Sequence, residues 1–107
     1  MTTLAIKMII DSVVRDYTNM GKALYVIHSG DNERGLIYLK INDKNNMGKF
    51  TICSREYDFN SDKYTWNEID NLNESDADNK LSDFHNGDKD CWCIEIEDNI
   101  NPFKDII

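Results

Sequence analysis

Residues 88–98 read Asp-Lys-Asp-Cys-Trp-Cys-Ile-Glu-Ile-Glu-Asp, a short apolar run between charged ends. Side chains point to alternate faces along a strand, so Trp92, Ile94 and Ile96 share one face. The opposite face carries Cys91, Cys93, Glu95 and Glu97. We predict a strand over residues 91–97, with the tryptophan and the isoleucines turned toward the core.

A helix is predicted just before this strand, over residues 73–86. Ala77, Leu81 and Phe84 recur at three- and four-residue spacing and form its apolar face. Ser75 and Asp78 approximate a capping box at its start, and Gly87 suits its end.

The N-terminal segment, from about Thr3 to Met20, shows the same helical period. Its apolar stripe consists of Ile6, Ile9, Ile10, Val13, Val14 and Tyr17. Thr3 is suited to cap the first turn, and Gly21 to end the helix in a left-handed conformation.

Strand-like segments occupy the middle of the chain. They cover residues 23–29, 36–42 and 49–55, with a weaker fourth over 64–69. Short loops that contain glycine join the first three, and such connections favour antiparallel hairpins between neighbours. The order α-β-β-β-(β)-α-β therefore predicts an α+β fold. We expect a mostly antiparallel, four- to five-stranded sheet with two helices packed on one face.

The composition is that of an ordinary globular protein. The chain has 107 residues, of which 40% are hydrophobic, and one proline. This predicts a single domain over residues 1–107. No segment approaches the roughly 20 apolar residues of a membrane span, so we expect no membrane association. Three cysteines, an odd number, indicate reduced thiols and a cytoplasmic location.

The net charge of -8 is unevenly distributed along the chain. Residues 1–55 hold eight Lys/Arg and five Asp/Glu, whereas residues 56–107 hold four Lys/Arg and fifteen Asp/Glu. An acidic half repels phosphates, which argues against binding to nucleic acid or to anionic lipid. A basic protein partner fits this charge better.

Several segments together suggest a family. They are Val13–Arg15, Gly21–Ala23, Gly30-Asp31, Gly35–Lys40 and, above all, Asp88–Asp98. In this order they resemble a family of small bacterial proteins, typical of alphaproteobacteria and catalogued as a domain of unknown function, family 1491. Its members usually carry an aliphatic residue where Cys91 stands and more arginine near Arg15. The resemblance implies the same element order and a bacterial cytoplasmic setting, and it assigns no catalytic residue.

The acidic residues around the last strand are the candidate site: Asp88, Asp90, Glu95, Glu97 and Asp98. We predict that they form the contact surface of a small non-catalytic interaction module that binds a basic protein. If the strand carboxylates instead lie opposite Lys40, Lys49 or Arg55, they form cross-strand pairs that set the register.

Two other functions stay open. Glu95 and Glu97 lie about 7 Å apart on one strand face and, with Asp98 and His28, could serve an acid–base or metal-dependent enzyme. The acidic half could also mimic nucleic acid and occupy a protein that binds it. Because neither His28 nor His85 has a recognisable nucleophile context, we assign no catalytic residue.

The three thiols raise the hypothesis of a zinc site. Cys91 and Cys93, completed by Cys53, His28 or His85, would supply the roughly four ligands that zinc requires. Only one Cys-x-Cys pair is present, so we favour buried thiols and predict no metal and no cofactor.

Residues 58–62, Asp-Phe-Asn-Ser-Asp, resemble the opening of a calcium loop. Lys63 stands where that loop requires glycine, so we predict an Asx-rich turn instead.

The C-terminal tail carries Phe103, Ile106 and Ile107. These apolar residues either dock on their own domain or form contacts in a symmetric homodimer.

Overall fold

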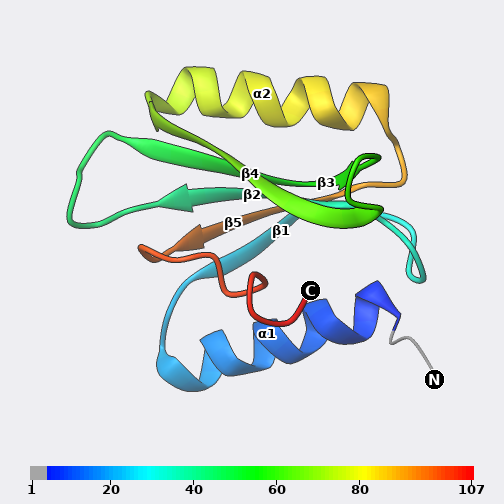
Figure 1. Cartoon of the computed structure of the whole chain (residues 1–107). Helices are drawn as coiled ribbons and strands as arrows, with labels where there is room; N and C mark the ends of the chain where they lie inside the picture. Colours follow the sequence, from blue (N-terminus) through cyan, green and yellow to red (C-terminus); the bar gives the residue numbers. More distant parts are fainter. Residues whose placement is uncertain (1–4) are drawn as a thin grey trace.

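The structure is a computed structural model that describes residues 5–107. Its elements, in chain order, are α1 (Ile6–Met20), β1 (Leu24–His28), β2 (Ile37–Asn42), β3 (Phe50–Asp58), β4 (Lys63–Leu72), α2 (Glu74–Gly87) and β5 (Trp92–Glu97). Figure 1 shows a single sheet between the two helices. The α+β fold and the order of elements are confirmed. The weak fourth strand is real and longer than predicted.

The sheet has the strand order β1-β5-β2-β3-β4. The predicted hairpin β2–β3 is antiparallel, as are the pairs β3–β4 and β1–β5. β2 and β5 form the one parallel pair of the described sheet, so it is mostly antiparallel. The hairpin expected between β1 and β2 is wrong, because β5 inserts between them. Four of the six residues of β5 are buried, and a central position gives the strand a neighbour on each side.

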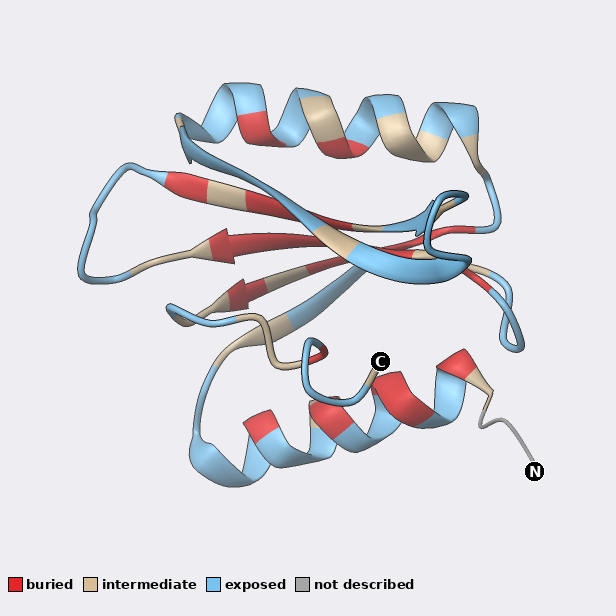
Figure 2. Ribbon diagram, in the orientation of Figure 1, coloured by how far each residue is buried: buried red, intermediate tan, exposed pale blue. Residues whose placement is uncertain are grey.

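The two helices lie on opposite faces of the sheet, so the prediction that both pack on one face is wrong (Figures 1 and 2). The physical reason is the second face of β5. Cys91 and Cys93 are fully buried there, and a sheet that is apolar on both faces must be covered on both.

Two apolar clusters fill the spaces between the sheet and its helices. On the α1 side, the stripe of α1 packs on the face of Trp92, Ile94 and Ile96, together with Phe103. On the α2 side, the buried residues are Tyr38, Phe50, Ile52, Ala77, Leu81, Cys91 and Cys93. The predicted inward face of β5 is therefore confirmed, and the thiols belong to the second cluster.

The ends of α1 are set by backbone contacts. The predicted cap, Thr3, lies outside the described residues, and the helix begins after Ala5, whose side chain caps nothing. The amides of Ile6 and Lys7 instead donate to carbonyls in the loop after β1. Gly21 ends the helix with φ 70°, the left-handed conformation expected of it.

The capping residue of α2 differs from the prediction by two positions, although the helix itself begins within one residue of the predicted start. Asn73, not Ser75, is the N-cap, and its side-chain oxygen accepts a hydrogen bond from the amide of Asp76 at 2.8 Å. Both helices are amphipathic and short. Neither of them, within the described chain, combines the length and apolar character needed to cross a bilayer.

The loop between β1 and β2 is tied to the start of β5. Trp92 Nε1 donates to the carbonyl of Asp31 at 2.9 Å, and the amide of Asp31 donates to the carbonyl of Asp90 at 2.8 Å. Gly30 lies so close to this strand that a Cβ would stand 2.2 Å from the oxygen of Asp90. Gly30 therefore permits the backbone contact that holds β5 beside the loop.

We predict that Gly30→Ala destabilises the fold by about 3 kcal/mol, because the added methyl group overlaps backbone atoms that cannot move independently. Gly87→Ala is the matched control, since a Cβ there meets nothing within 4 Å. That control should be neutral or stabilising by up to about 1 kcal/mol. Urea unfolding measures both variants, and equal stabilities would contradict the close-approach argument.

Candidate functional site

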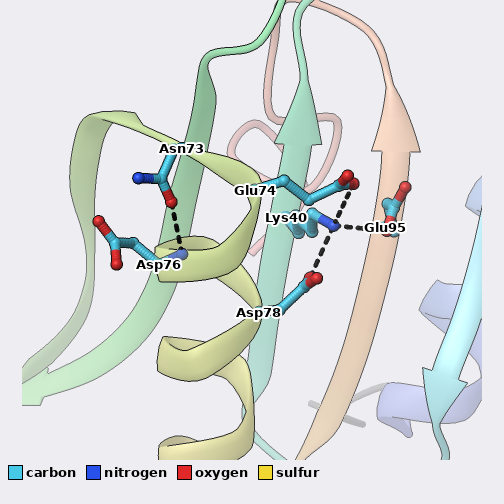
Figure 3. A network of polar contacts seen from close by, with 6 residues as sticks. All are labelled: Lys40, Asn73, Glu74, Asp76, Asp78 and Glu95. Carbon is cyan, nitrogen blue, oxygen red and sulfur yellow. Dashed lines mark hydrogen bonds and ion pairs between the residues drawn. The ribbon is translucent and has the colours of Figure 1, made fainter.

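Lys40, in the centre of β2, organises the polar contacts on the α2 side of the sheet (Figure 3). Its Nζ lies 2.7 Å from Asp78, 3.1 Å from Glu74 and 3.1 Å from Glu95. Glu95 is its direct neighbour on β5, so the cross-strand pair considered from the sequence is confirmed. The ammonium group of Lys40 also lies over an aromatic ring, with Nζ 4.8 Å from the ring centroid of Phe50.

The side chain of Lys40 is only 3% exposed, and its charge is held by these partners. Burial alone would lower the pKa of Lys40, but the hydrogen bonds to Asp78, Glu95 and Glu74 outweigh burial and raise it. Lys40 therefore stays charged at neutral pH. It fixes the first turn of α2 against β2 and β5.

The end of β5 holds two more of the predicted site residues, and both are in ion pairs. Glu97 lies 3.2 Å from Lys44. Asp98 accepts a hydrogen bond from the hydroxyl of Tyr17 at 2.6 Å and lies 3.3 Å from Lys22. Burial alone would raise the pKa of Asp98, but the bond from Tyr17 and those from the Asn99 amide and Lys22 lower it.

Asp88 and Asp90 lie at the other end of β5. Asp88 accepts a hydrogen bond from the amide of Asp90, and Asp90 is exposed. About eight strand residues at roughly 3.3 Å each separate Asp90 from Asp98, so the five acidic residues do not share one patch. That they serve as a contact surface stays a prediction, and three of them already have partners within the chain.

The contact surface predicted from the sequence did not include the outward face of α2. Asp76 and Asp83 are both exposed, and they lie two turns apart on one line of the helix, about 10 Å along its axis. Residues 74–90 hold six Asp/Glu and two lysines. The composition of this segment was the available signal, and the helical spacing of Asp76 and Asp83 could have found the pair.

The carboxylates proposed for an enzyme do not converge with a histidine. Glu95 is engaged by Lys40, and Asp98 by Tyr17, on opposite sides of the sheet. His28 instead stacks on His85, with ring centroids 3.9 Å apart. Loss of solvent and the neighbouring His28 lower the pKa of His85. That acid–base site is therefore not assembled in the described chain.

The thiols divide between the two faces of the sheet. The Sγ atoms of Cys91 and Cys93 lie 3.9 Å apart on the α2 side, whereas Cys53 belongs to the α1-side cluster. Burial raises the pKa of Cys53 and of Cys93 to about 12, so these thiols are poor ligands and nucleophiles. Across residues 5–107, no group of three His, Cys, Asp or Glu is close enough to hold a metal ion.

Residues 58–62 form the tight connection between β3 and β4. Asp58 accepts hydrogen bonds from the amide of Asn60 and the hydroxyl of Ser61, and Asp62 adopts φ 57°. These are the contacts of an Asx turn, so the prediction of a turn rather than a calcium loop is confirmed.

The apolar tail docks on its own domain. Phe103 is fully buried in the α1-side cluster and Ile107 packs against it, whereas Ile106 is 51% exposed. Phe103 and Ile107 therefore dock on their own domain, as one of the two alternatives for the tail predicted.

A family model described as "Protein of unknown function (DUF1491)" matches residues 4–103 of this chain. The chain belongs to the DUF1491 family. This confirms the resemblance noted in the sequence. No curated protein matches the chain.

Solved structures agree with this membership. A crystal structure of a DUF1491 protein from Caulobacter crescentus shares 22% identity, covers 90% of this chain and 89% of its own, and has a TM-score of 0.75. An NMR structure of a DUF1491 protein from the same species shares 21% identity, covers 92% of this chain and 89% of its own, and has a TM-score of 0.78. A solution structure of protein Atu0922 from A. tumefaciens shares 15% identity, covers 96% of this chain and 92% of its own, and has a TM-score of 0.71. At these identities the likeness shows the DUF1491 fold and no activity.

We predict that Lys40→Met destabilises this DUF1491 protein by about 3 kcal/mol, because Glu95 loses its buried cation. Lys44→Met is the matched control, since Lys44 is 72% exposed and its pair with Glu97 should contribute less than about 1 kcal/mol. Chemical unfolding at pH 7 measures both. If the two variants lose the same stability, Lys40 is not the organising cation.

Tyr17→Phe should cost about 1.5 kcal/mol at pH 7, because it removes a donor to the ionised Asp98. The native pKa of Asp98 is lowered, so the stability it contributes is present above its ordinary value of 3.8 and is lost as the pH falls through the native value. The deficit of the variant should therefore shrink in acid. Urea unfolding between pH 7 and pH 3 tests this, with the exposed Tyr25→Phe as control. A deficit independent of pH would contradict the role of Asp98.

Proposed function

We propose that this DUF1491 chain is a cytoplasmic, non-catalytic interaction module, and that it binds a basic partner protein through the outward face of α2. We call this face the acidic α2 surface and define it by Asp76 and Asp83. The observation that carries the proposal is the arrangement of charge on α2. Its acidic residues divide into an inward pair, held by Lys40, and an outward row that faces solvent.

The ion pairs support this choice of residues. Glu95, Glu97 and Asp98 are each engaged by a lysine of the chain, so their charge is offset before any partner arrives. Asp76, Asp83 and Asp90 form no ion pair within residues 5–107 and are exposed. These charges are therefore available to a basic partner.

The rigidity of α2 is the second support. Asn73 caps its first turn, Lys40 fixes the same turn to the sheet, and Ala77 and Leu81 are buried against it. Carboxylates on a fixed helix are presented at a constant spacing without loss of backbone freedom on binding. Their long-range attraction should act mainly on the rate of association.

The test is a comparison of three baits in capture from bacterial extract, followed by binding measurements with the purified captured protein. The baits are the native chain, Asp76→Lys with Asp83→Lys, and Asp16→Lys with Asp105→Lys. Asp16 and Asp105 are exposed and lie outside α2, so the control has the same change in net charge.

The proposal requires a protein that the native chain and the control retain and the α2 variant loses by at least tenfold in affinity. Its affinity should fall when salt rises from about 0.05 M to about 0.5 M, since exposed charges are screened. Equal loss with both variants would show an effect of net charge alone and would overturn the role of α2. Recovery of no partner with any bait would count against an interaction module.

A further inference from the structure

A cleft on the α1 side of the molecule is unlike the acidic α2 surface in its chemistry. Its volume is about 380 Å³. It lies between the first turn of α1, the loop after β1, strands β3 and β4, and the last two residues of the chain. The lining residues are Ile6, Ile9, Glu33, Arg34, Arg55, Tyr64, Ile106 and Ile107. No residue of the acidic α2 surface takes part in it.

Arg55 supplies the fixed positive charge of this cleft. Its guanidinium carbon lies 4.2 Å from the ring centroid of Tyr64, so the group is held by stacking. It forms no ion pair within residues 5–107, although the chain carries a net charge of -8. Its Nε is buried and has no hydrogen-bond partner. Burial lowers the pKa of Arg55, which reflects the cost of a charge without a partner.

A second unpaired donor lies beside Arg55. Trp66 is its direct partner across the β3–β4 ladder, so the two side chains are neighbours on one face of the sheet. Trp66 packs against the α1-side cluster, and its Nε1 is also buried without a partner. The other tryptophan of the chain, Trp92, has its Nε1 bonded to the carbonyl of Asp31.

The Nε of Arg55 and the Nε1 of Trp66 are closed to solvent, and Trp66 does not line the cleft, so a ligand would meet the terminal N–H groups of Arg55. A carboxylate matches these groups, because it is anionic and accepts at two oxygens. Arg34 and Glu33 are both exposed in the neighbouring loop, and their opposite charges offset one another. The half-buried Arg55 is therefore the group that selects the sign of the ligand.

The remaining walls are apolar. Ile6 and Ile9 contribute from α1, and Ile106 and Ile107 from the tail. Taking about 30 Å³ for each water-sized group, the 380 Å³ of the cleft would hold roughly a dozen non-hydrogen atoms. This size is at the lower end of the range for small-molecule sites.

We propose that this cleft binds a small carboxylate with an apolar body, such as a medium-chain fatty acid. The carboxylate accepts hydrogen bonds from the guanidinium of Arg55, and the hydrocarbon packs between α1 and the C-terminal isoleucines. The site is independent of the proposed partner surface, because it lies on the other face of the sheet.

Octanoate is the probe, and 1-octanol is its uncharged counterpart. In a ¹⁵N-resolved NMR titration, octanoate should shift the indole N–H of Trp66, the cross-strand neighbour of Arg55, and leave that of Trp92 in place, since Trp92 does not line the cleft and already has its acceptor. Octanol should bind at least tenfold more weakly, because it lacks the charge that Arg55 recognises. Equal affinities, a shift confined to Trp92, or no binding of octanoate would overturn the proposal.

Two pairs of variants locate the site. Arg55→Met keeps the apolar stem and should weaken octanoate at least tenfold, whereas the exposed Arg15→Met should not. If Arg55→Met does not fold, Ile106→Asp serves instead, because Ile106 is 51% exposed and a carboxylate there repels the probe. Ile100→Asp, at a 59% exposed position outside the cleft, is its control. Octanoate affinity that is unchanged in Arg55→Met or in Ile106→Asp would overturn the assignment.

Discussion

Strand β5 lies between β1 and β2 and is buried on both of its faces, and the rest of the molecule is arranged around that burial. Trp92, Ile94 and Ile96 require α1 below them, whereas Cys91 and Cys93 require α2 above them. The parallel register with β2 places Glu95 opposite Lys40. The contact of Gly30 with the backbone of Asp90 and Cys91 holds the β1–β2 loop at the start of the strand.

The same arrangement sorts the charges of the chain. A lysine buried in the middle of a sheet needs carboxylates, and Lys40 obtains them from β5 and from the first turn of α2. The carboxylates nearest the sheet thereby become part of the fold. The acidic residues of α2 that remain free to meet another molecule lie on its far side. On the opposite face, Arg55 lies in a cleft with mostly apolar walls and forms no ion pair within residues 5–107, so the two faces of one small sheet differ in polarity.

Membership of the DUF1491 family accounts for the fold and leaves the chemistry to be argued from the side chains. The structural relatives share 15% to 22% identity with the chain, so their backbones support its topology and their surfaces say nothing of its ligands. The acidic α2 surface and the α1-side cleft are properties of this chain's own residues. They have separate tests because no residue belongs to both.

Local periodicity determined both helices, all five strands and the inward face of β5, since each depends only on residues a few positions apart. Local residue types also determined the Asx turn at Asp58 and the left-handed conformation of Gly21. The neighbours of β5 and the opposite placement of the helices were decided by tertiary structure, because the burial of Cys91 and Cys93 depends on α2, a separate element. The same holds for the candidate sites. The acidic character of residues 74–90 is visible in the sequence, whereas the capture of Glu95 by Lys40 arises only when β2 and β5, which are far apart in the sequence, align.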